Sequence, residues 1–179
     1  MKKLLYLILL ITSFSYGQTA EEYFNRGYTK HKLKDYERAI ADYTKAIEIN
    51  PNYIDAYLNR GVIKKHFNDF NGAMADYTKA IEINPNDAKA YYSRGYAYYN
   101  RGNIKGDLKD YNGAISDFTK AIEINPNEAE IYYNRGSAKD DLKDYDGAIL
   151  DYTKAIKIKP NHIVIHNQNK ILWNLYQLE

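Results

Sequence analysis

The sequence predicts an all-α solenoid made of four helical hairpins and a C-terminal capping helix. The stretch DYTKAIEINPN recurs almost letter for letter, beginning at Asp42, Asp76, Asp117 and Asp151. Apolar residues before and within each copy follow the period of an α-helix, and each copy ends at a proline, before which helical backbone angles are disfavoured. Repeats of this length cannot bury their apolar face alone and stack into a solenoid.

Composition narrows the class of protein further. The chain has 179 residues and no cysteine, which excludes disulfides and cysteine-bound metals. Residues 1–17 read as an export signal, with Lys2 and Lys3 before an apolar run and small residues before a cleavage point at Gln18. We therefore expect a periplasmic or extracellular protein. The alternative is that this segment is a buried or membrane-anchoring first helix.

Removing the signal also removes the basic excess. Lys2 and Lys3 are two of the 25 basic residues, so 23 remain against 23 acidic residues. A nucleic-acid-binding protein would show a clear excess of positive charge, so the sequence argues against nucleic acid as a partner. No later segment is apolar enough to suggest stable membrane insertion.

Each repeat reads as two helices. The predicted repeats span 20–53, 54–87, 88–128 and 129–162, within a domain of residues 18–162. First helices are predicted to begin at capping boxes, where a side-chain oxygen accepts from free N–H groups and an acid follows three residues on; these start at Thr19, Asn52 and Asn127. Second helices are predicted to begin at Asp35, Asp69, Asp110 and Asp144, each followed by an aromatic residue.

Glycines mark where the two helices of a hairpin should approach closely. Gly27, Gly61 and Gly136 each precede an alanine of the second helix by twelve residues. Glycine inside a helix costs up to about 1 kcal/mol relative to alanine. Its recurrence at one repeat position therefore predicts a contact that a side chain would wedge apart.

These residues carry a resemblance to the tetratricopeptide-repeat (TPR) family over residues 20–162. The family's aromatic–small–Ala–aromatic–Ala–Pro pattern falls, in the first unit, on Tyr23, Gly27, Ala39, Tyr43, Ala46 and Pro51. The resemblance implies a right-handed solenoid in which first helices line a concave groove that receives peptides or partner helices. One departure recurs: arginine stands before the glycine, and we interpret it as a structural partner of the aspartates that open the DYTKAI copies.

The third unit is seven residues longer and doubles a motif, YYSRGYAYYNRG, over 91–102. Gly95 is in register with the preceding proline, and Gly102 with the following Ala114. Either the first helix is two turns longer, or the extra residues bulge as a loop at 100–107. The loop-like composition of NRGNIKGD favours the bulge, with Gly95 as the architectural glycine and Gly102 in the loop. Beyond the repeats, the apolar residues of 163–179 predict the capping helix.

Nothing in the sequence indicates catalysis or a cofactor. His162 and His166 have the spacing of a metal pair, but no third ligand is near in sequence, so no metal site is predicted. The sequence instead predicts a non-enzymatic adaptor that holds a protein or peptide in the concave groove. The family's lysine–asparagine clamp for a terminal carboxylate is not supported, because Phe24 and Tyr28 take its places in the first unit.

The predicted groove residues follow from matching repeat positions on the first helices. They are Phe24, Asn25, Tyr28, Leu58, Asn59, Val62, Tyr92, Ser93, Tyr96, Tyr99, Tyr133 and Asn134. Recurrent asparagines could hold an extended peptide backbone, since an amide both donates and accepts. Tyrosines offer contact area with a hydroxyl handle. Three alternatives remain open: a glycan-binding module that uses the groove tyrosines, a purely structural or self-assembling spacer, and an enzyme accessory that supplies part of an active site.

Overall fold

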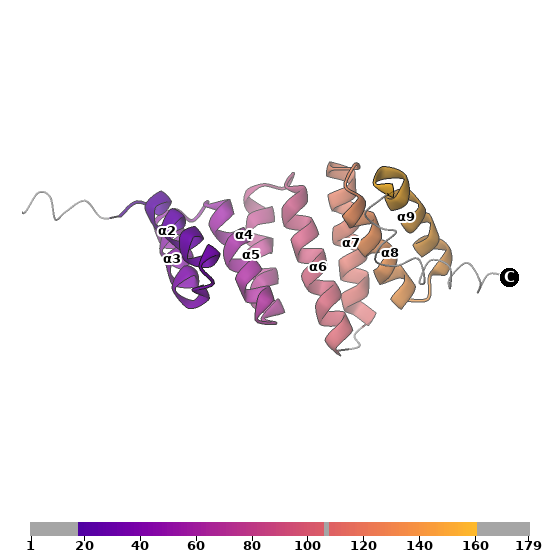
Figure 1. The fold of residues 1–179 in the computed structure, drawn as a ribbon, viewed down its shortest axis with the longest axis horizontal. Helices are drawn as coiled ribbons and strands as arrows, with labels where there is room; N and C mark the ends of the chain where they lie inside the picture. Colours follow the sequence, from indigo (N-terminus) through magenta and orange to yellow (C-terminus); the bar gives the residue numbers. More distant parts are fainter. Residues whose placement is uncertain (1–17, 106–107, 161–179) are drawn as a thin grey trace, which may run out of the picture.

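The computed structural model describes residues 18–105 and 108–160, and in these ranges it contains eight α-helices and no strand. The helices pair as four antiparallel hairpins, which lie side by side in chain order along the long axis (Figure 1). Their bounds are α2 (Ala20–Lys32) with α3 (Tyr36–Ile49), α4 (Ile54–His66) with α5 (Phe70–Ile83), α6 (Ala88–Lys105) with α7 (Leu108–Ile124), and α8 (Ala129–Asp141) with α9 (Tyr145–Ile158). The predicted export signal and capping helix lie outside the described residues.

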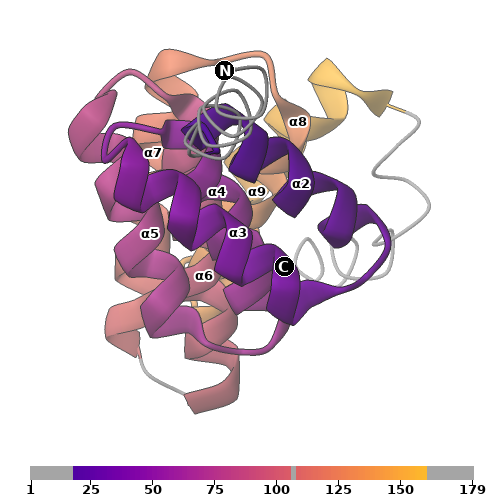
Figure 2. The same cartoon turned by 90° about the vertical axis from the view of Figure 1, so that its left-hand side faces the viewer.

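First helices form the inner layer of the stack. Each helix packs against its hairpin partner and against the adjoining helix of the next hairpin. In addition, α2 contacts α4, α4 contacts α6 and α6 contacts α8, whereas within 18–105 and 108–160 no second helix contacts the next second helix. Because the stack is tighter on the first-helix side, that side is concave. Figure 2 looks along the stack, with α2 and α3 nearest the viewer. The predicted all-α solenoid of hairpins is confirmed.

In every hairpin a buried aromatic ring lies over the glycine that recurs within the first helix. Tyr43, Tyr77, Phe118 and Tyr152 are at most 1% exposed. A Cβ added at Gly61 would lie 2.6 Å from Cε1 of Tyr77, and one added at Gly136 would lie 2.8 Å from Cε1 of Tyr152. The expected close approach is therefore present. The atoms nearest to each of these two glycines belong to the aromatic ring that follows it by sixteen residues, whereas the sequence predicted a contact with the alanine that follows it by twelve.

The predicted helix starts are right for some hairpins and wrong for others. At Thr19 the capping box is complete, since Thr19 Oγ1 accepts from Glu22 N at 3.1 Å and Glu22 Oε2 accepts from Thr19 N at 2.9 Å. The boxes predicted at Asn52 and Asn127 are wrong, because α4 and α8 are preceded by Tyr53 and Glu128, neither of which caps with its side chain. Asn52 instead donates its backbone N–H to Asn50 Oδ1 at 3.0 Å, in a turn around the proline.

Second helices begin at aspartate in three hairpins. Asp35, Asp69 and Asp144 are the N-cap residues of α3, α5 and α9. Asp69 and Asp144 accept from the backbone N–H of Gly72 and Gly147 at 2.9 and 3.0 Å. Asp110 does not follow this prediction: it lies inside α7 and is 4% exposed.

The loop predicted at 100–107 is wrong, because α6 continues through Lys105. In each of the three other hairpins the first helix has 13 residues, the second helix has 14, and three residues join them. In the third hairpin α6 has 18 residues and α7 has 17, with two residues between them. The first helix thus gains five residues, the second gains three and the connection loses one, which accounts for the insertion of seven.

Both glycines of the doubled motif are therefore architectural. A Cβ at Gly95 would lie 3.0 Å from Phe118 Cδ1, and one at Gly102 would lie 3.1 Å from Tyr111 Cε1. Both glycines are buried in α6 and face α7. The prediction that Gly102 lies in a loop is wrong. It was based on the local composition, which does not show that a partner helix packs against this glycine.

The reason lies in α7, which carries its own heptad copy. Asp110-Tyr111 and Asp117-Phe118 are seven residues apart, as are the two Arg-Gly pairs of α6. Because the two helices run antiparallel, Arg94-Gly95 lies opposite Asp117-Phe118, and Arg101-Gly102 lies opposite Asp110-Tyr111. The hairpin consequently grows at its turn end, where α6 and α7 reach beyond their neighbours in Figure 1, and the fourth hairpin still stacks on the third.

Candidate functional site

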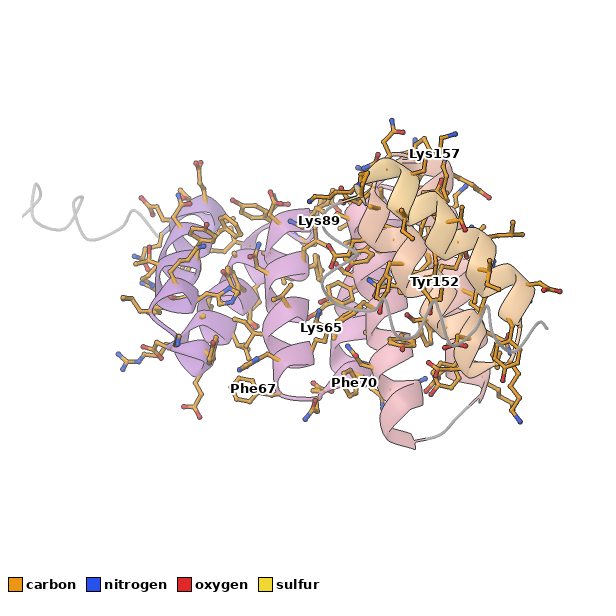
Figure 3. All side chains as sticks on the ribbon, turned by 45° about the vertical axis from the view of Figure 1, so that its right-hand side comes forward. Lys65, Phe67, Phe70, Lys89, Tyr152 and Lys157 are labelled. Carbon is orange, nitrogen blue, oxygen red and sulfur yellow. The ribbon has the colours of Figure 1, made fainter. Side chains whose placement is uncertain are left out.

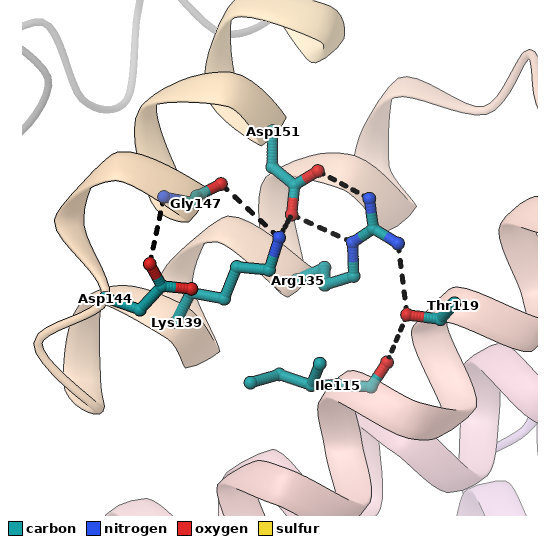
Figure 4. A network of polar contacts seen from close by, with 7 residues as sticks. All are labelled: Ile115, Thr119, Arg135, Lys139, Asp144, Gly147 and Asp151. Atoms are coloured by element: carbon teal, nitrogen blue, oxygen red, sulfur yellow. Dashed lines mark hydrogen bonds and ion pairs between the residues drawn. The ribbon is translucent and has the colours of Figure 1, made fainter.

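The recurrent arginines hold the scaffold on which the concave face is built. Arg60 donates from Nε and Nη2 to Asp76 at 3.0 and 2.7 Å, and from Nη1 to Thr44 Oγ1 of the preceding hairpin at 2.9 Å. The same three bonds join Arg94 to Asp117 and Thr78, and Arg135 to Asp151 and Thr119 (Figure 4). Each of these three arginines therefore links the two helices of its own hairpin and also binds the preceding hairpin.

The aspartates of this network are nearly inaccessible to water. Asp42, Asp76, Asp110, Asp117 and Asp151 are all at most 5% exposed. In three hairpins a lysine also reaches the aspartate: Lys30, Lys64 and Lys139 lie 2.7 to 2.9 Å from it. Bidentate, charge-assisted pairs of this kind are strong and directional. The structural interpretation of the arginines is confirmed.

Two opposing effects act on the pKa of Asp42. Burial raises it, but the hydrogen bonds from Arg26 and Lys30 and their positive charges outweigh burial, so the pKa lies below its usual range. The carboxylate is thus held in its charged form as part of the scaffold.

In the first hairpin the predicted groove residues lie on an aromatic surface. Phe24 is half-buried, with its ring centroid 5.0 Å from that of Tyr53 and 6.4 Å from that of Tyr28. Tyr28 is 44% exposed and Asn25 is exposed. Two of the three predicted groove residues of α2 are therefore exposed to solvent.

The second hairpin contributes less than predicted. Leu58 is 3% exposed and belongs to the core shared by α4, α5 and α6. Val62 is half-buried. Asn59 donates its side-chain amide to the Asp55 backbone oxygen at 2.8 Å, so this rung of the predicted asparagine ladder is engaged within its own helix.

The third hairpin carries three of the predicted groove tyrosines, Tyr92, Tyr96 and Tyr99, which follow one another along α6 as a tyrosine stripe. Tyr92 and Tyr96 are stacked, with centroids 6.2 Å apart, and Tyr99 lies 5.9 Å from Tyr111. All three rings are half-buried, as is Ser93. Tyr98 is half-buried as well, and its ring lies over Gly113 of α7.

A polar link joins the third hairpin to the fourth. The Tyr92 hydroxyl donates to Glu130 Oε1 at 2.7 Å and accepts from Asn134 Nδ2 at 3.0 Å. Burial and the bond to Glu130 together raise the pKa of Tyr92, so the phenol stays neutral. Asn134 is 8% exposed, and Tyr133 is half-buried with its centroid 5.5 Å from that of Tyr152.

Lys65 connects the second hairpin to the same stripe. Its Nζ lies 4.4 Å from the centroid of the Tyr96 ring, a cation–π contact between α4 and α6. Burial lowers the pKa of Lys65, while the charge of Glu130 acts in the opposite direction. The structure thus brings Lys65, Tyr96, Tyr92, Glu130 and Asn134 into one row across three first helices.

An open pocket of about 250 Å³ lies at one end of this row, where α6 and α8 begin. It is lined by Ala88, Lys89, Tyr92, Asn125, Glu128, Glu130 and Ile131. Sequence reasoning missed the two glutamates as site residues, because an acid near a helix start reads as a cap. Only the alignment of the repeats, which places Glu130 in the hairpin after that of Tyr92, could have predicted the contact between these two residues.

Residues 18–105 and 108–160 contain no group of three or more His, Asp or Glu side chains placed to hold a metal ion. None of the helices described is both long and apolar enough to cross a membrane.

Sequence profiles of the TPR family match most of the chain. Profiles described as tetratricopeptide repeat match residues 20–53, 42–75, 95–128 and 129–162, and one described as TPR repeat matches 68–102. The chain belongs to the tetratricopeptide-repeat family. The match at 95–128 places Gly102 in the standard repeat position, in agreement with its packing against Tyr111.

Solved structures of MamA have the same fold. One described as the crystal structure of MamA is 28% identical with a TM-score of 0.74, covering 85% of this chain and 84% of that one. A second, of MamA protein, is 29% identical with a TM-score of 0.71, covering 80% and 74%. A MamA fragment from Desulfovibrio magneticus RS-1, 23% identical with a TM-score of 0.70 over 80% and 77%, shows the fold alone. Curated protein sequences gave no match. Family and fold together support a protein-interaction scaffold.

Proposed function

We propose that this protein is a non-enzymatic adaptor that binds a peptide or partner segment along its concave face. The observation that carries the proposal is the tyrosine stripe of α6. Tyr92 and Tyr96 stack on the first-helix side of the stack, and contacts to Lys65 and Glu130 continue the surface onto α4 and α8. Half-buried tyrosines give a partner apolar area and hydrogen-bonding groups together, as binding surfaces commonly do.

The scaffold beneath this surface supports the proposal. Each Arg–Asp–Thr bridge fixes a hairpin to its neighbour through bonds of 2.6 to 3.0 Å. A partner that spans several hairpins therefore meets side chains already held in place, which lowers the entropy cost of binding.

Affinity capture tests the groove. The full chain serves as bait in a cell-envelope extract, beside a Tyr28→Ala/Tyr96→Ala variant that removes two groove rings. The matched control is Lys79→Ala/Glu82→Ala, which removes an exposed ion pair on α5. We expect a specific protein to be captured by the wild type and the control, and captured at least tenfold less by the groove variant, with all three giving the same circular dichroism spectrum.

If the groove variant captured as much of the partner protein as the wild type does, the groove proposal would be contradicted. Retardation on a polysaccharide gel that is lost in the same variant would favour a glycan ligand instead. A mass that rises with concentration, with no captured partner, would favour a self-assembling spacer.

The protein is further proposed to act outside the cytoplasm after cleavage before Gln18. The basic start, short apolar run and small residues of 1–17 support this. Mass spectrometry of the protein from the producing cell's envelope or medium should give a chain that begins at Gln18. A chain that retains Met1 there would contradict it.

A further inference from the structure

The pocket between the starts of α6 and α8 has chemistry that selects one kind of side chain. Resting on the proposed function, we propose that this pocket binds an arginine side chain of the partner segment. The guanidinium would stack on the Tyr92 ring and pair with the carboxylates of Glu128 and Glu130. The pocket would thereby set where the partner lies along the groove.

The first hairpin shows what normally fills this place. Phe24 stands at the same repeat position as Tyr92, four residues into the first helix, and Tyr53 stands at the same position as Glu128, one residue before the next first helix. Tyr53 lies against Phe24 with ring centroids 5.0 Å apart and planes inclined by 32°. In the third hairpin glutamate replaces that ring. The Tyr92 ring keeps its contacts with Tyr96 and Phe118, and it also lines the pocket.

The second hairpin shows that an acidic residue just before a first helix is not always available to bind a ligand. Asp87 stands at the equivalent position and caps α6, since its Oδ1 accepts from the backbone N–H groups of Lys89 and Ala90 at 2.9 and 3.2 Å. Glu128 is longer, is exposed, and makes no such cap for α8. Its carboxylate is therefore available at the pocket rim.

Glu130 is oriented toward the pocket by its neighbours. Its Oε1 accepts from the Tyr92 hydroxyl at 2.7 Å, and that hydroxyl is fixed in turn by Asn134. Aromatic ring and carboxylate are thus held together before any partner arrives. Ala88 and the buried Ile131 supply apolar walls that suit the methylene stem of a long side chain.

Charge and shape select arginine. The pocket carries two carboxylates against one ammonium, Lys89, which is exposed at the start of α6 (Figure 3). A planar guanidinium can stack on an aromatic face while its N–H groups pair with carboxylates, whereas an ammonium ion lacks the plane and an acid would be repelled.

Selection from a phage library of random dodecapeptides tests the proposal. The full chain is panned beside Glu128→Gln/Glu130→Gln, which keeps the shape of both side chains and removes both charges. The control, Glu82→Gln/Glu123→Gln, changes two exposed glutamates on α5 and α7. We expect the wild type and control to enrich peptides with arginine at one fixed position, and the pocket variant to bind them about tenfold more weakly, as loss of a charge-assisted pair predicts.

A charge reversal sharpens the result. Glu128→Lys/Glu130→Lys should shift the selected position from arginine to aspartate or glutamate. Enriched peptides without an arginine preference, or with unchanged affinity for the pocket variant, would overturn this inference and leave the groove proposal standing. If no peptide is enriched, both are contradicted.

Discussion

Replacing Asp110 by alanine should destabilise the protein by about 2 to 3 kcal/mol, whereas the same change at Asp144 should cost about 1 kcal/mol. The two aspartates stand in the identical tetrapeptide Leu-Lys-Asp-Tyr, at 108–111 and 142–145. They differ in what surrounds them. Asp144 is an exposed N-cap that accepts one bond from Gly147 N at 3.0 Å, while Asp110 is 4% exposed inside α7.

The magnitude follows from the partner that Asp110 would leave behind. Its carboxylate accepts from Arg101 Nε and Nη2 at 2.7 and 2.5 Å. Removing one member of a buried pair costs about 3 to 5 kcal/mol, because the other charge stays desolvated. The Arg101 side chain is 21% exposed, so water offsets part of this cost and the expected loss falls at or below the lower end.

Urea unfolding measures both variants. The far-UV circular dichroism and tyrosine fluorescence transitions must coincide before free energies of unfolding are compared, because terminal hairpins of a repeat protein can unfold separately. A double-mutant cycle with Arg101→Ala should show a coupling of about 1 kcal/mol or more between Arg101 and Asp110. Equal losses for Asp110→Ala and Asp144→Ala, with no coupling, would mean that Asp110 is only a cap and that α6 and α7 are not extended.

Three further predictions test the scaffold. Gly61→Ala should destabilise by about 1 to 3 kcal/mol in thermal unfolding despite the better helix propensity of alanine, because the new Cβ would lie 2.6 Å from the fully buried Tyr77; a gain in stability would refute the close approach. Thr44→Val should cost about 0.5 to 1.5 kcal/mol, because the half-buried Arg60 loses its bond to the first hairpin; an unchanged urea midpoint would show that the bond contributes nothing. Stability should fall with acid as the pH drops from about 4 toward the lowered pKa of Asp42, since the pair with Arg26 and Lys30 stabilises the fold only while the carboxylate is charged; Asp42→Asn should flatten this dependence, and an unaltered acid limb would contradict it.

The repeat made most of the fold predictable. Helix type, hairpin order and the register of Gly27, Gly61 and Gly136 follow from periodicity and from prolines that end each copy. The Arg–Asp pairing was also predictable in the first, second and fourth hairpins, where the arginine that departs from the family pattern stands sixteen residues before the aspartate. In the third hairpin the pairs Arg94–Asp117 and Arg101–Asp110 span 23 and 9 residues, so a constant spacing does not find them.

The third hairpin shows where local reading fails. Leu-Lys-Asp-Tyr forms a tight turn at 33–36 and 142–145, where Lys34 and Lys143 adopt positive φ angles of 61° and 64°. The same letters at 108–111 begin a helix, because Arg101 and Gly102 stand opposite and provide a charge partner and room for Tyr111. A tetrapeptide cannot report a partner that lies on the other helix.

The site was less predictable than the fold for the same reason. The position of a residue on a helix face predicts which way its side chain points, but it does not predict how deeply the side chain is buried. Leu58 was therefore expected in the groove, whereas it lies in the core. Glu130 and Tyr92 meet across 38 residues, and the pocket beside them is lined by Glu128, which stands where another hairpin has Tyr53.

Site-specific photo-crosslinking in the producing cells tests the central claim most directly. A photoreactive phenylalanine analogue is placed at Tyr96, on the concave face of α6, or at Lys79, an exposed residue of α5. If first helices form the binding surface, irradiation should join a partner protein to the Tyr96 variant and leave the Lys79 variant unmodified. Adducts that form at Lys79 as efficiently as at Tyr96 would contradict a partner site in the groove.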